Sequence, residues 1–164
     1  MALPARGDYF DRARALAASV CLAAAAAATI GSLLEWVRIT PVGGGEPRLI
    51  EGVPNASEPF TGLEARDGWY VVAAGLVIAV STVIAMARRK RTFAWLAAAA
   101  AVVIGAIALA DLRAIDDTAS GISRRMDIIG DADPGFGLLL VGASGVIGLL
   151  GAVGLLTATP PQRD

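Results

Sequence analysis

The sequence predicts an all-α membrane protein with four transmembrane helices, and two observations support this fold class. Apolar residues make up 55% of the 164 residues, and the mean hydropathy of +0.63 is too high for a soluble domain of this size. Four apolar runs of roughly 19–23 residues occur along the chain, and an α-helix needs about 20 residues to cross the hydrocarbon core of a bilayer. The runs cover residues 15–37, 69–87, 92–112 and 136–157.

The first run follows a segment, residues 1–14, that contains Arg6, Arg12 and Arg14. An arginine-rich start before a run of alanines is also typical of a cleaved signal peptide. The apolar run is longer than the usual 7–15 residues of such a peptide, and its removal would leave an odd number of spans. We therefore expect it to remain as the first transmembrane helix.

The positions of the basic residues predict the orientation. The short connection between the second and third runs consists of Arg88, Arg89, Lys90 and Arg91. Short loops rich in lysine and arginine stay in the cytoplasm, whereas the long connections, residues 38–68 and 113–135, carry most of the acidic residues. The sequence thus predicts a bacterial plasma-membrane protein with both termini, including the tail 158–164, in the cytoplasm.

The first long loop predicts a small β-hairpin outside the membrane. Residues 36–42 and 48–53 are two short β-rich runs that flank the glycine turn 43–45. Pro41 restricts the first run to an edge strand. Because an isolated hairpin is marginal in water, we expect it to rest on another surface.

The second long loop predicts a short amphipathic helix, since its apolar residues recur at helical spacing. These residues are Ile115, Ala119, Ile122, Met126 and Ile129. Such a helix is compatible with two positions: flat on the outer membrane surface, or packed over the hairpin as a small extracytoplasmic cap. We favour the cap, because it gives both loops a buried face, although Gly121 weakens the helix by about 1 kcal/mol.

The fourth run carries a row of glycines that predicts close helix packing. The row consists of Gly142, Gly145, Gly148, Gly151 and Gly154. Small residues let helix backbones approach closely in lipid, and a spacing of three drifts around a helix of 3.6 residues per turn, so several neighbours can be touched. Contact within the bundle and contact with a partner subunit are both compatible with this row.

The chain contains two similar segments, residues 22–31 and 96–105, each an alanine-rich stretch that ends in Ile-Gly. They fit a duplicated two-helix hairpin with both halves in the same orientation. Alanine-rich low complexity gives the same similarity, and the sequence leaves both interpretations open.

Two motifs resemble those of uncharacterised small four-span membrane proteins of actinobacteria. The first is the segment Phe60-Thr-Gly-Leu-Glu-Ala-Arg-Asp-Gly-Trp69 before the second span, and the second is Asp133-Pro-Gly-Phe-Gly-Leu-Leu-Leu-Val-Gly142 at the start of the last. The resemblance implies the four-span plan and a bacterial source, and it adds no catalytic residue.

Composition leaves little catalytic chemistry. The chain has no histidine and a single cysteine, Cys21, so the usual general base at neutral pH and the commonest zinc ligands are missing, and an internal disulfide is excluded. A net charge of −1 offers no basic surface for nucleic acid. We expect no catalytic residue, no cofactor and no metal site, and we do not expect an enzyme.

Charged residues within reach of the membrane stand at the outer ends of two spans. Glu35 and Arg38 stand at the outer end of the first span, and Asp111 and Arg113 stand at the outer end of the third. Carboxylates at this depth can relay protons or bind cations, but each has an arginine nearby and lies close to lipid headgroups. We expect these residues to form interfacial ion pairs.

Small size, absent catalytic equipment and an outer cap together favour a non-catalytic integral subunit, accessory or assembly factor of a larger transport or respiratory membrane complex. Its expected partners are other integral membrane proteins and the lipid bilayer. A small oligomeric transporter, channel or lipid-handling protein is the alternative, and a homo-oligomer fits it. No span interior carries the charge, proline or broken helix that usually marks a transported substrate's site.

Overall fold

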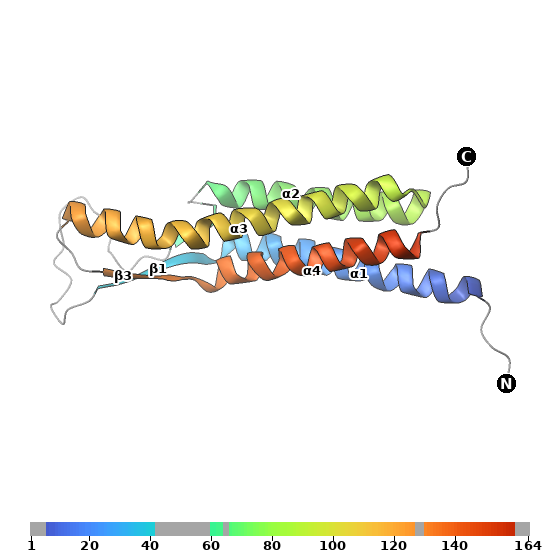
Figure 1. Ribbon diagram of the computed structural model, residues 1–164, viewed down its shortest axis with the longest axis horizontal. Helices are drawn as coiled ribbons and strands as arrows, with labels where there is room; N and C mark the ends of the chain where they lie inside the picture. Colours follow the sequence, from blue (N-terminus) through green and yellow to red (C-terminus); the bar gives the residue numbers. More distant parts are fainter. Residues whose placement is uncertain (1–5, 42–59, 64–65, 127–129, 160–164) are drawn as a thin grey trace, which may run out of the picture.

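The computed structural model describes residues 6–41, 60–63, 66–126 and 130–159 (Figure 1). Within these residues, four long helices alternate with three short strands. The elements are α1 (Arg6–Leu33), β1 (Glu35–Pro41), β2 (Phe60–Thr61), α2 (Asp67–Arg88), α3 (Arg91–Met126), β3 (Gly130–Pro134) and α4 (Phe136–Ala158).

The helices form a four-helix bundle in which α4 packs on α1 and α3, and α2 packs on the same two helices from the other side. The start of α1, the connection between α2 and α3, and the end of α4 lie together at one end of the bundle, here called the arginine end (Figure 1). The strands lie at the opposite end, here called the sheet end.

Each helix contains a segment long and apolar enough to cross a membrane. The segments are Tyr9–Leu33, Asp67–Arg88, Arg91–Ile115 and Phe136–Ala158. The prediction of four apolar helices is therefore confirmed. The first helix ends earlier than predicted, at Leu33, because residues 35–37 join a strand.

The distribution of side-chain size across the bundle fits a lipid environment. Many of the buried side chains are alanines, among them Ala24, Ala28, Ala97, Ala101 and Ala108. Large apolar side chains point outward instead, as Leu16, Leu76, Val146 and Leu150 do. A bundle folded in water would bury such side chains, whereas in lipid the close approach of small residues provides the packing.

The predicted short amphipathic helix is not a separate element. Helix α3 continues without a break from its apolar run, residues 92–112, to Met126. With 36 residues at 1.5 Å per residue, it is about 54 Å long and exceeds a hydrocarbon core of about 30 Å. The sequence between Leu112 and Ser120 contains neither glycine nor proline to end the helix.

The strands form a three-stranded antiparallel sheet in the order β2-β1-β3. Strand β1 pairs with β3 from Val37↔Pro134 to Pro41↔Gly130, and with β2 near Glu35. The β structure predicted for the first long loop is thus present, with β1 as its first strand. The second predicted strand, residues 48–53, lies outside the described residues, and β3 was not expected from the sequence.

Strands β1 and β3 extend beyond the bundle beside the last part of α3 (Figure 1), and α3 contacts β3. We call β1, β3 and residues 116–126 of α3 the projection. The contact between α3 and β3 agrees with a helix that packs against the β structure, and a helix continuous with the bundle does not lie flat on a membrane surface.

Candidate functional site

Charged residues are confined to the two ends of the bundle. Residues 15–34, 68–87, 92–110 and 135–159 contain no aspartate, glutamate, lysine or arginine. Polar chemistry can therefore occur at the arginine end or at the sheet end, and the middle of the bundle holds apolar and small side chains together with a few hydroxyl groups.

At the sheet end, two carboxyl groups from neighbouring helices meet. The carboxyl group of Asp111 in α3 lies beside that of Asp67, in the first turn of α2. Its Oδ2 atom is buried and has no hydrogen-bond partner within the described part of the chain. Two neighbouring carboxyl groups repel each other when both are ionised, and they can share a proton when one of them is protonated.

The other residues predicted to form interfacial ion pairs also lie at the sheet end. Glu35 begins β1 and its backbone carbonyl lies against Gly135 and Gly137. Arg38 stands opposite Asp133 in the register of β1 and β3. Arg113 is exposed on α3. For Asp111 itself, the acidic neighbour from another helix is Asp67.

Trp36 links the elements of the sheet end. Its side chain is only 2% exposed, and its indole Nε1 donates a hydrogen bond of 2.9 Å to the carbonyl of Gly31 in α1. Its carbonyl accepts a bond of 2.7 Å from the Gly135 N–H, just before α4. The ring also covers Gly62, where an added Cβ would stand 2.2 Å from the indole Cε2.

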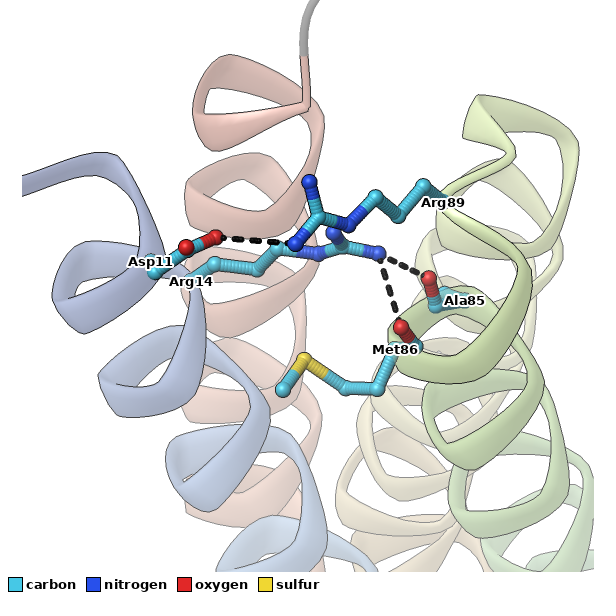
Figure 2. Close-up of polar contacts among 5 residues, drawn as sticks. All are labelled: Asp11, Arg14, Ala85, Met86 and Arg89. Atoms are coloured by element: carbon cyan, nitrogen blue, oxygen red, sulfur yellow. Dashed lines mark hydrogen bonds and ion pairs between the residues drawn. The ribbon is translucent and has the colours of Figure 1, made fainter. Parts of the chain in front are cut away.

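At the arginine end, Arg14 reaches across from α1 to the end of α2 (Figure 2). Its side chain is almost fully buried, with 4% exposure, and its guanidinium donates to the carbonyls of Ala85 and Met86, the latter at 3.2 Å. These carbonyls belong to the last turn of α2, where the helix dipole favours a cation, and the Ala85 carbonyl also accepts the Arg89 N–H at 3.0 Å. Arg14 therefore caps α2 and fixes α1 against it.

The basic connection between α2 and α3 is tied to both of the remaining helices. Arg89 closes α2 in a left-handed conformation with φ 53°, and its guanidinium lies 3.3 Å from the carboxylate of Asp11 in an exposed ion pair (Figure 2). Arg91 donates a bond of 2.8 Å to the carbonyl of Thr159, after the end of α4. Arg88 and Lys90 are exposed.

The glycine row of α4 faces three helices in turn. Gly142 and Gly145 lie against α3, where an added Cβ on Gly145 would come within 2.8 Å of the Gly105 nitrogen. Gly148 lies in the centre and faces α1, α2 and α3. Gly151 and Gly154 lie against α1. The row thus follows its predicted drift around the helix, and these contacts are within the chain.

The residues that the structure describes contain no group of three or more histidine, cysteine, aspartate or glutamate side chains that could hold a metal ion. Cys21 is buried between α1 and α4, with its Sγ 3.8 Å from the carbonyl of Gly148.

Sequence reasoning did not identify the roles of Arg14, Trp36 and Asp67. Arg14 stands among other charged residues before an apolar run, and Trp36 fits a strand pattern. The local sequence pattern therefore did not distinguish either residue from its neighbours. The place of Arg14 inside the membrane-crossing segment Tyr9–Leu33 is seen only in the structure.

No protein-family model matches the chain, and the comparison with curated proteins finds no significant match. The resemblance to actinobacterial four-span proteins stays a prediction. The candidate site is accordingly defined by the geometry of the two ends alone.

Proposed function

We propose that the chain is a multi-pass protein of the bacterial plasma membrane, with the arginine end in the cytoplasm. The four apolar helices and their outward-facing large side chains support the membrane location. The concentration of basic residues in the short connection 88–91 supports the orientation, because such loops resist translocation.

Cysteine labelling tests this orientation. In a Cys21→Ser background, a membrane-impermeant maleimide added to intact cells is expected to label Asp133→Cys and to miss Lys90→Cys. Both positions are exposed, so differences in burial do not explain the result. After lysis both variants should react. Labelling at position 90 in intact cells would contradict the orientation.

We further propose that the protein is a non-catalytic integral subunit, accessory or assembly factor of a larger membrane complex, and that it binds its partner through the projection. One observation carries this proposal: α3 continues to Met126, beyond its apolar run 92–112, and contacts β3. The bundle itself does not need this extension to pack its four helices.

The character of the bundle supports a binding role over transport. Its interior is filled by close contacts between alanine and glycine residues of adjacent helices, and its membrane-crossing segments contain no proline. Transporters usually place ionisable groups or broken helices near the middle of the membrane. The charged residues of this chain stand at the ends instead.

Affinity isolation in mild detergent, followed by mass spectrometry, tests the proposed subunit role. We expect a stoichiometric set of integral membrane proteins to co-purify with the wild type. The double variant Arg124→Gln with Arg125→Gln removes two charges from the projection. It should retain less than about a tenth of the partner, because removing a charge that is desolvated in an interface typically weakens the binding free energy by more than about 1.4 kcal/mol.

The matched control is Arg88→Gln with Lys90→Gln, which removes two exposed charges from the arginine end and should leave partner recovery unchanged. Deletion of residues 43–57, which lie outside the described part of the chain, should also reduce recovery. A pure homo-oligomer without other membrane proteins would contradict the subunit proposal.

A proton-coupled transporter is the second candidate, favoured by the neighbouring carboxyl groups of Asp67 and Asp111. The variant Asp111→Asn discriminates between the two functions, because its amide can still donate a hydrogen bond to the Asp67 carboxylate but cannot carry an exchangeable acidic proton. The subunit proposal expects unchanged partner recovery and cellular function. Loss of function with normal expression and assembly would favour transport.

A further inference from the structure

A groove runs along the outside of the bundle between α1 and α4 at the arginine end. Its volume is about 480 Å³. Ala17, Gly151 and Gly154 form its floor, and larger side chains that include Leu16 and Leu150 form its walls.

The groove exists because α1 and α4 touch where both have small residues. An added Cβ on Gly151 would stand 2.8 Å from the Sγ of Cys21, and one on Gly154 would stand 3.0 Å from the Cβ of Ala17. The floor is therefore close-packed backbone. Leu16 and Leu150 are 69% and 65% exposed, so the side chains that form the walls are accessible from outside the bundle.

The groove extends over one half of the membrane thickness. Along α1 it runs from Tyr9 to Val20, which at 1.5 Å per residue is about 17 Å. One leaflet of a hydrocarbon core of about 30 Å has nearly the same depth. A partner helix would need a seam across the whole membrane, whereas an acyl chain needs the depth of one leaflet.

The end of the groove is suited to a lipid headgroup. Tyr9 and Phe10 form an edge-to-face pair at its mouth, with ring centroids 6.2 Å apart, and aromatic rings of this kind favour the membrane interface. Arg12 is exposed one helical turn from Leu16, and arginines extend from such positions toward headgroups. The arginine end also carries the basic connection 88–91.

We propose that this groove binds one anionic phospholipid, with an acyl chain along the floor and the phosphate near Arg12. Arg14 takes no part, because its guanidinium faces the carbonyls of α2. The complementary charge of the arginine end selects the headgroup, and the leaflet-long apolar groove accepts the chain. This site is independent of the partner proposed for the projection.

Native mass spectrometry of the delipidated protein, titrated with dioleoyl phosphatidylglycerol or dioleoyl phosphatidylcholine, tests the proposal. We expect phosphatidylglycerol to bind about fivefold more tightly, the preference that one basic residue near an anionic headgroup confers. Arg12→Gln should remove this preference, and Arg113→Gln, an exposed arginine at the sheet end, should retain it.

Filling the groove provides the second arm. Ala13 lines the groove and is half-buried, so Ala13→Leu should abolish the tight binding of phosphatidylglycerol while the melting temperature stays near that of the wild type. Ala26→Leu places the same side chain at an exposed position of α1 outside the groove and should bind as the wild type does.

Three results would overturn the proposal. The first is equal binding of both lipids by the wild type, and the second is unchanged binding by Ala13→Leu. The third is a dimeric wild type that Ala13→Leu converts to a monomer, which would assign the groove to a second copy of the chain.

Discussion

Replacement of Trp36 by alanine is expected to destabilise the bundle by about 3–5 kcal/mol, the usual cost of removing a buried tryptophan ring. The side chain is 2% exposed and fills the space above Gly62. Its loss leaves a cavity at the point where α1, β1 and the turn before α2 meet. It also removes the indole donor of the Gly31 carbonyl in α1.

The measurement is the apparent melting temperature in mild detergent. Trp69→Ala is the matched control, because Trp69 is 63% exposed and the same atoms are removed from the surface. Trp36→Phe keeps most of the ring volume and loses the N–H, so it should fall between wild type and Trp36→Ala. Equal melting temperatures for Trp36→Ala and Trp69→Ala would show that the ring does not join these elements.

Features that depend on residues close together in the sequence could be predicted, whereas contacts between residues far apart in the sequence were missed. A membrane-crossing helix satisfies its own backbone hydrogen bonds, so hydropathy within one window suffices to find it. The glycine row was also visible, because the glycines recur at a regular spacing of three within a single helix. Both features are local properties of the chain.

The pairing of β1 with β3 is different, because the two strands are separated by two membrane-crossing helices. The segment 130–134 contains two aspartates and a proline, residue types that are depleted in strands. It becomes a strand because α3 and α4 bring it beside β1. No local pattern encodes that approach, and the same is true of the contact between Asp67 and Asp111.

Arg14 shows the same limit for a single side chain. A charge before an apolar run normally ends in water or among headgroups, and Arg12, two residues earlier, is exposed. The rotation of about 200° between the two positions on a helix turns Arg14 toward the last turn of α2. Its burial depends on which helix lies there, and the sequence of α1 alone does not contain this information.

Gly148→Leu is expected to be the most damaging change in the glycine row, because Gly148 faces three helices at once. An added Cβ would already stand 3.3 Å from that of Ala101, 3.5 Å from that of Ala24 and 3.7 Å from the Cδ1 of Ile78. The remaining carbons of leucine have no space between α1, α2 and α3. Overpacking of this kind typically costs about 1–3 kcal/mol, and the melting temperature in mild detergent should fall accordingly.

Insertion into the membrane should be unaffected, since leucine in a transmembrane helix is favourable. Gly105→Leu is the matched control: an added Cβ at Gly105 meets nothing within 4 Å, so the side chain extends outward. Both variants exchange glycine for leucine within a helix, and the gain in helix propensity therefore cancels in the comparison. Equal melting temperatures for Gly148→Leu and Gly105→Leu would show that the central face of α4 is in contact with lipid. That result would contradict the close packing of the four helices around Gly148.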